Sequence, residues 1–143
     1  MRHLLDVNVW VAVLDEAHVH HAQALRFVQR SKVQIATCPL VENGVIRVLN
    51  MPGYSKHGPA GFIAVRNKLK EICARLDHRF WPDSVSLRSD ETVNWPRVLG
   101  HSQITDVYLL ALAVANRGCL ATLDHRVALS TVLGASDKNL LLL

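Results

Sequence analysis

Short apolar runs that end at or near a carboxylate recur along this chain and alternate with stretches of helical spacing. The four carboxylates are Asp6, Glu42, Asp106 and Asp124. Apolar neighbours draw such a side chain toward the interior, where its charge is costly unless a cation meets it. The pattern therefore favours a fold that gathers these acids around a shared counter-charge, and a divalent metal ion is the simplest candidate.

Length and composition indicate one globular domain. The chain has 143 residues, of which 50% are hydrophobic and 20% are charged. We therefore expect a single domain over residues 1–143, with enough apolar surface for a core. The formal net charge of +4 suits a polyanionic partner but does not establish one.

The cysteines and the apolar runs indicate a cytoplasmic protein. Cys38, Cys73 and Cys119 are odd in number and form no C-x-x-C pair, as is typical of buried thiols in a reducing compartment. The N-terminus has no signal-peptide pattern. The longest apolar run, residues 107–115, is too short to span a membrane, so we expect no membrane association.

Strand-like runs alternate with helix-like stripes along the chain. The predicted strands are residues 2–6, 34–37, 79–81, 119–123 and 140–143. The predicted helices are residues 9–14, 20–29, 39–50, 59–76, 106–117 and 127–133. Thr105 is expected to cap the helix at 106, and Gly118 to end it. This alternation predicts an α/β, Rossmann-like three-layer fold with a parallel sheet of about five strands.

Parallel sheets place their sites at the carboxyl ends of their strands. Asp6 and Asp124 end two predicted strands, and Glu42 and Asp106 lie in the first turns of two helices. All four side chains can therefore lie at the same rim of the sheet, the edge where its parallel strands end. Oxygen-only ligands select Mg²⁺ or Mn²⁺, which can activate a bound water and stabilise charge on a phosphoryl group. The sequence thus predicts metal-assisted chemistry on a phosphate.

Simpler roles are open to each residue. Asp106 would be favoured in a helix's first turn by the helix dipole alone, and Glu42 could pair with Arg47. Asn8 either fixes the Asp6 loop, or holds a metal-bound water, or caps the following helix. Thr105 and Thr122 stand near acids, but capping or turn formation explains them better.

Four stretches resemble the PIN-domain ribonucleases, and among them the VapC-like toxins of toxin–antitoxin pairs. The stretches are residues 4–9, 37–44, 103–113 and 120–124. The resemblance implies a PIN-like fold and a magnesium-dependent endoribonuclease in which a water attacks the RNA backbone in line.

The resemblance also implies roles for the four acids. Asp6 and Asp106 would be the main metal ligands, Glu42 a ligand or a group that positions the attacking water, and Asp124 would complete the site. The family further implies a homodimer and an antitoxin that covers the site, often with an arginine set against the acids.

A histidine-rich stretch and several residues near the acids have open roles. His18, His20 and His21 could bind zinc, but a solvated helix start is the preferred interpretation. Arg126, like His101 and His125, could contact RNA phosphates. Trp81 and Trp95 could stack on bases, although packing in the core or in a dimer is the better explanation.

Two other functions compete with a nuclease. An inactive relative could bind RNA or a protein without catalysis, although four intact acids argue against it. A phosphatase working through an aspartyl intermediate could use the same kind of sheet. Asp6-Val7-Asn8 lacks the second aspartate common in such enzymes, and no lysine stands in a matching context.

Overall fold

The computed structural model describes residues 1–143 and contains one five-stranded sheet in the order β3-β2-β1-β4-β5. Every neighbouring pair of strands is parallel. The strands are β1 His3–Leu5, β2 Gln34–Thr37, β3 Asp77–Phe80, β4 Cys119–Thr122 and β5 Leu140–Leu142. The predicted parallel sheet of five strands is confirmed.

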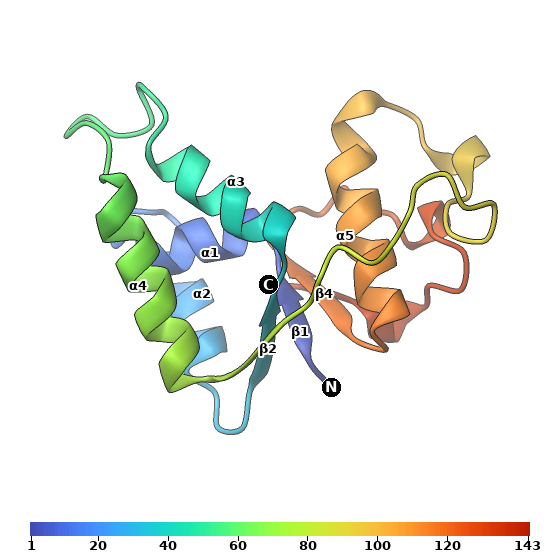
Figure 1. The fold of residues 1–143 in the computed structure, drawn as a ribbon, viewed down its shortest axis with the longest axis horizontal. Helices are drawn as coiled ribbons and strands as arrows, with labels where there is room; N and C mark the ends of the chain where they lie inside the picture. Colours follow the sequence, from blue (N-terminus) through green and yellow to red (C-terminus); the bar gives the residue numbers. More distant parts are fainter.

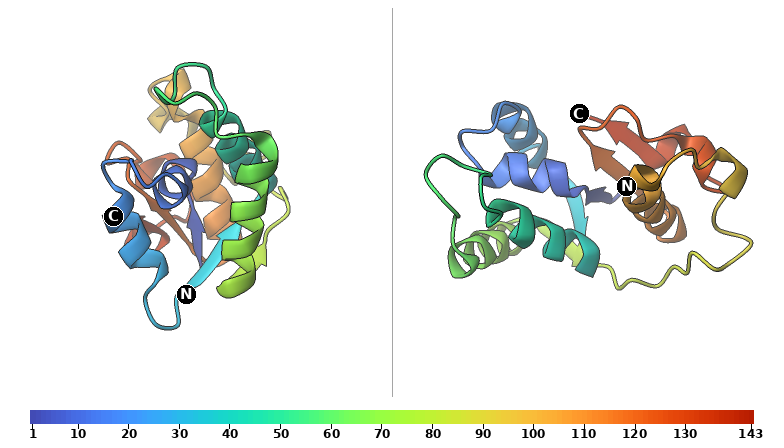
Figure 2. Two further views of the ribbon diagram at one scale, coloured as in Figure 1. Left: turned by 90° about the vertical axis from the view of Figure 1, so that its left-hand side faces the viewer. Right: turned by 90° about the horizontal axis from the view of Figure 1, so that it is seen from above.

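Five α-helices flank the sheet, as expected for a three-layer α/β fold (Figure 1). They are α1 Val7–Leu14, α2 His21–Val28, α3 Pro39–Leu49, α4 Phe62–Arg75 and α5 Ile104–Ala115. Helices α2 and α4 lie on opposite faces of the sheet (Figure 2, left), and α5 packs against β4 and β1. None of these helices combines the length and apolar character that crossing a membrane requires.

Two local predictions about helices are wrong. Residues 127–133 contain only a 3-10 turn, Leu129–Thr131, in place of the expected α-helix. Helix α5 begins at Ile104, and Thr105 lies exposed inside its first turn and makes no capping hydrogen bond. The preceding 3-10 turn His101–Gln103 leads directly into α5, so this helix starts without a side-chain cap.

The end of α5 also differs from the prediction. Arg117, and not Gly118, adopts the left-handed conformation, with φ of 53°. Gly118 is needed for space, because a Cβ atom there would lie 2.5 Å from Trp81 Cη2 and 2.8 Å from the Arg2 carbonyl oxygen. Trp81 itself is buried in the core, so its interpretation as a packing residue is confirmed.

The order of the strands creates a switch point between β1 and β4. From β1 the chain moves outward through β2 to β3, and it then crosses to β4 and β5 on the other side. The extended segment after β3 makes this crossing in Figure 2 (right). The carboxyl ends of β1 and β4 are therefore adjacent, at the place where open α/β sheets bind their ligands.

Gly44 permits a close approach of α3 to the start of α1. A Cβ atom at this position would lie 2.6 Å from Val7 Cγ2, a distance that real Cβ contacts do not show. Val7 directly follows Asp6. The spacing of these two helices thus affects the loop that carries the first acid.

We expect Gly44→Ala to lower the free energy of unfolding by about 1 kcal/mol. Overpacking should outweigh the roughly 1 kcal/mol that alanine gains over glycine within a helix. The check is a double-mutant cycle with Val7→Ala, measured by urea denaturation. In the Val7→Ala background the clash is gone, so Gly44→Ala should become neutral or stabilising; equal effects in both backgrounds would contradict this account.

Candidate active site

Asp6 caps α1 and is held rigidly between two elements. Its Oδ1 accepts a hydrogen bond from the Val7 backbone N–H at 2.6 Å. Its Oδ2 accepts from Thr122 Oγ1 at 2.7 Å and from Asn8 Nδ2 at 2.8 Å. Burial raises the pKa of this carboxyl, while the hydrogen bonds from Thr122 and Val7 act in the opposite direction. Asp6 is thus a buried acid in a fixed orientation at the switch point.

Asn8 and Thr122 connect the end of β1 to the end of β4. The Asn8 amide also donates to Thr122 Oγ1 at 3.0 Å, and its Oδ1 accepts from the Leu123 backbone N–H at 3.2 Å. The Asp124 backbone N–H donates to Thr122 Oγ1 at 3.0 Å. Asn8 therefore fixes the Asp6 loop, and its interpretation as a helix cap is wrong because Asp6 fills that position.

Thr122 is the residue that sequence reasoning undervalued. Its side chain is fully buried, and its hydroxyl contacts Asp6, Asn8 and the backbone of Asp124. The one available signal was its place two residues before Asp124, on a strand that would lie beside β1. Capping or turn formation explained that place better from the sequence, so only the strand order reveals the role.

Asp106 faces the other acids without a hydrogen-bond donor of its own. It lies in the first turn of α5, and none of the hydrogen bonds or ion pairs in the structure involves its carboxylate. Burial, followed by the charges of Asp6 and Asp124, raises its pKa to about 6. Arg126 opposes this shift. A half-buried carboxylate repelled by two others, and bound by nothing, is the group in this site that most needs a cation.

Asp124 is bound by Arg126, two residues further along the chain. The Arg126 guanidinium donates from Nε at 3.0 Å and from Nη2 at 2.7 Å, and its backbone N–H donates at 2.9 Å. These bonds lower the pKa of Asp124. Arg126 is otherwise exposed, with 82% of its side-chain surface accessible. The arginine weighed as an RNA contact thus serves here as a counter-charge to Asp124.

Glu42 is not brought into the group formed by the three aspartates. Its Oε1 accepts a hydrogen bond from Thr37 Oγ1 at 2.7 Å, and Thr37 Oγ1 also lies 2.8 Å from His78 Nε2. The charge of Glu42 works to raise the pKa values of His78 and Cys73. The charges that shift the pKa of Asp106 are those of Asp6, Asp124 and Arg126. The alternative pairing with Arg47 does not occur either.

A pocket opens beside the aspartates, which we call the acid pocket. It measures about 370 Å³, and its lining residues are Asp6, Val7, Asn8, Val11, His18, Val48, Tyr54 and Asp106. Asp106 also lines a second hollow of about 270 Å³, together with Arg126 and the segment around Gly100. Asp106 therefore borders two separate hollows. Thr105, which was considered as a supporting residue of the site, lines neither of them.

The donor set fits a hard divalent cation, although the side chains do not form a closed metal cage. No three His, Cys, Asp or Glu side chains are arranged to surround an ion as they stand. Asp106 nevertheless presents a donor-free carboxylate to the buried Asp6, and all the nearby charged acceptors are oxygens. Oxygen ligands of this kind suit Mg²⁺ or Mn²⁺.

We expect Thr122→Val, which keeps the side-chain shape, to weaken divalent-cation binding by about 10–100-fold because the orientation of Asp6 is lost. It should also lower the free energy of unfolding by about 1–3 kcal/mol, since buried polar partners lose their bonds. Calorimetric titration with Mn²⁺ and urea denaturation measure the two effects. Thr122→Ser, which keeps the hydroxyl, is the matched control; equal Mn²⁺ affinities of the two variants would contradict this role.

The sheet order and the acids at its switch point define a class, the PIN-domain proteins, and comparison with known proteins agrees. The PIN domain family matches residues 3–131. Ribonuclease VapC44 of Mycobacterium tuberculosis strain H37Rv is 36% identical over 141 residues, which cover 98% of each chain. Ribonuclease VapC29 of the same strain is 37% identical over 125 residues, or 87% of each chain.

A solved structure shares the fold. The crystal structure of VapBC2 from Rickettsia felis, bound to a DNA fragment from its promoter, matches with a TM-score of 0.55. The match has 18% sequence identity and covers 88% of this chain and 90% of that one. The family match and the relatives of 36% and 37% identity show that the chain belongs to the PIN-domain family, and within it to the VapC ribonucleases.

Proposed function

We propose that this protein is a magnesium-dependent endoribonuclease that hydrolyses phosphodiester bonds of RNA as the toxin of a toxin–antitoxin pair. The single observation that carries the proposal is the donor-free, half-buried carboxylate of Asp106, set against Asp6 at the switch point of a PIN-domain sheet. Membership of the VapC ribonucleases supports RNA as the substrate.

In this proposal Asp6 and Asp106 would hold the metal, and Asp124 would join them if it released Arg126. Mg²⁺ bound there would supply charge stabilisation at the phosphate and a more acidic water. The chain contributes orientation, because Asn8 and Thr122 fix the Asp6 carboxylate in place. An attacking water then forms a bond to phosphorus as the bond to the leaving ribose oxygen breaks.

We also propose a part for Glu42, as a group that positions the attacking water once its side chain leaves Thr37. Glu42→Gln tests this, because glutamine keeps an acceptor for the Thr37 hydroxyl and so preserves the link seen in the structure. A loss of cleavage with an unchanged melting temperature would support the proposed part. Unchanged cleavage would overturn the proposed part and leave Glu42 with a structural role only, the hydrogen bond that links β2 to α3.

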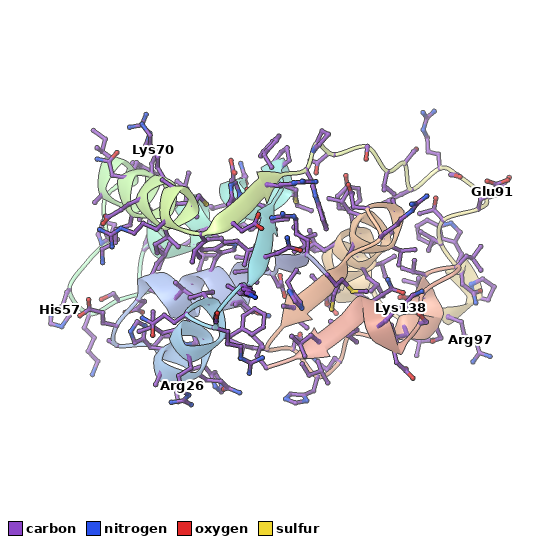
Figure 3. The ribbon with its side chains drawn as sticks, turned by 90° about the horizontal axis from the view of Figure 1, so that it is seen from below. Arg26, His57, Lys70, Glu91, Arg97 and Lys138 are labelled. Carbon is purple, nitrogen blue, oxygen red and sulfur yellow. The ribbon has the colours of Figure 1, made fainter.

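The proposed partners are RNA, a cognate antitoxin and a second copy of this chain, each copy forming a single PIN domain over residues 1–143 in the cytoplasm. Figure 3 labels four cationic side chains, Arg26, Lys70, Arg97 and Lys138, which are exposed and belong to four different elements. These four charges lie apart from one another and do not form one basic patch.

Incubation of the protein with total cellular RNA, followed by sequencing of the new ends, tests the proposed function. We expect discrete cleavage sites that require Mg²⁺ and that disappear with chelator or with Asp6→Asn. Cleavage that persists in chelator would overturn the metal-dependent mechanism. A protein that binds RNA but leaves every transcript intact would instead support the non-catalytic binding module.

A further inference from the structure

The acid pocket has a second kind of lining besides the aspartates. Asp6 and Asp106 supply its carboxylates, while His18, Tyr54 and three valines supply the remaining lining side chains apart from Asn8. A metal needs only the acids. The aromatic and imidazole groups of the same pocket have no role in the proposed metal site, which leaves them available to another ligand.

The orientation of the His18 ring is fixed by its own turn. Its Nδ1 accepts a hydrogen bond from the His20 backbone N–H at 3.1 Å. In a neutral imidazole the hydrogen then resides on Nε2. This nitrogen has no partner in the structure, and the residue is half-buried. His18 therefore carries one donor without a partner, and it lines a pocket whose carboxylates are acceptors.

Tyr54 is anchored by its hydroxyl, which leaves its ring as the contact surface. The hydroxyl donates to Asp15 Oδ2 at 2.7 Å, and Asp15 Oδ1 accepts from the Ala17 backbone N–H at 3.0 Å. Asp15 thereby ties the loop after α3 to the turn that carries His18. Tyr54 and His18 are thus held in place by the same carboxylate-centred turn.

The hollows on both sides of the acid pocket adjoin it through single residues. Tyr54 also lines a larger pocket of about 490 Å³, between the end of α1 and the start of α4. Asp106 lines the hollow beside Arg126. The acid pocket thus shares Tyr54 with one neighbouring hollow and Asp106 with the other.

Resting on the proposed ribonuclease function, we infer that His18 and Tyr54 bind an unpaired base of the RNA next to the phosphate that is cleaved. Bases of single-stranded RNA are recognised by stacking on aromatic rings and by hydrogen bonds to their edges. The Tyr54 ring supplies the first contact and His18 Nε2 the second. A base paired within a duplex could make neither contact without leaving its helix.

Fluorescence anisotropy with a short, labelled single-stranded RNA of mixed sequence tests the inference, with Ca²⁺ in place of Mg²⁺ to limit cleavage. Tyr54→Leu should weaken binding about tenfold through the loss of stacking. His18→Asn should weaken it about fivefold, because asparagine keeps an acceptor for the His20 N–H but loses the Nε2 donor. The same RNA annealed to its complement should bind more weakly to the wild-type protein.

Two control variants separate recognition from folding. His18→Gln places an amide donor near Nε2, and His20→Asn changes an exposed neighbour outside the pocket. Each should bind the single strand within about twofold of wild type, because the recognising groups remain. Tyr54→Phe keeps the ring but loses its hydrogen bond to Asp15, so it should bind more tightly than Tyr54→Leu and more weakly than the wild type. Melting temperatures, measured in parallel, show that all variants are folded.

The outcomes distinguish this inference from the proposed function. If the wild type cleaves cellular RNA but His18→Asn and Tyr54→Leu bind the single strand as well as it does, the inference is overturned and the nuclease stands. A wild-type protein that binds no single strand, or variants that lose only binding to a protein partner, would also overturn it. If the variants change RNA binding as expected but the wild type cleaves no RNA, the proposed ribonuclease function is overturned and the inference about base binding stands.

Discussion

Asp106→Asn is expected to reduce RNA cleavage by at least about 100-fold while making the metal-free protein more stable. Loss of a group that only supports a metal ligand already costs roughly 10–100-fold, and Asp106 is proposed to be a ligand itself. Its carboxylate has no donor and is repelled by Asp6 and Asp124, so an uncharged amide removes an unfavourable interaction. Cleavage rates and urea denaturation in chelator measure the two effects.

The gain in stability should depend on pH in a defined direction. The pKa of Asp106 is raised to about 6 in the folded protein, so the folded state takes up its proton more readily than the unfolded chain. The wild type therefore loses stability as the pH rises through this value. Allowing for solvent screening, Asp106→Asn should be more stable by about 1 kcal/mol at neutral pH, and by nothing below about pH 4.

The metal provides the control for this prediction. Mg²⁺ should stabilise the wild type, because it relieves the repulsion that asparagine removes. It should stabilise Asp106→Asn far less. A variant that is less stable than the wild type in chelator at neutral pH would contradict the account of Asp106 as an unneutralised charge.

Gly118→Ala is expected to lower the free energy of unfolding by about 3 kcal/mol, at the upper end for an overpacked site. The new Cβ atom would meet Trp81 Cη2 at 2.5 Å and the Arg2 carbonyl oxygen at 2.8 Å. The Arg2 carbonyl accepts the Cys119 N–H at 3.0 Å, so it cannot move without weakening the pairing of β1 with β4. Urea denaturation measures the loss.

Gly100→Ala is the matched control. Its φ of −165° is open to any residue, and a Cβ atom there meets nothing within 4 Å. It should change the stability by less than about 0.5 kcal/mol, as surface substitutions usually do. If both substitutions cost the same, the close approach of β1, Trp81 and Gly118 does not contribute to stability.

Much of the fold could be predicted from local patterns, because apolar periodicity reports which face of an element is buried. The strand after α2 is predicted at 34–37 and found at Gln34–Thr37. The predicted helix at 39–50 is found at Pro39–Leu49, where proline fits the first turn. The helix predicted at residues 127–133 was wrong because a short apolar run does not distinguish a helix from a packed 3-10 turn.

The candidate site was predictable as a set of acids, but its internal contacts were not. Placing Asp6 and Asp124 after strands and Asp106 at a helix start was enough to bring these three to one rim, since parallel strands end at the same edge. The hydrogen bond from Thr37 to Glu42, by contrast, depends on side-chain directions. Nothing in the spacing of residues 37–42 distinguishes an acid turned toward the three aspartates from one bound to Thr37 at the end of β2.

The sequence alone determined where strands and helices alternate and which carboxylates follow them, because these properties depend on neighbours within a few positions. Tertiary structure decided the rest: that Thr122 and Asn8 orient Asp6, that Arg126 neutralises Asp124, and that Gly118 is a packing residue. The contacts of Thr122 with Asp6 and of Gly118 with Trp81 join positions far apart in the chain. The pairs Asn8–Asp6 and Arg126–Asp124 are short-range, but they depend on how the chain is folded directly after β1 and β4. The strand order of the folded sheet sets the distances and directions between such groups, and local sequence patterns do not specify that order.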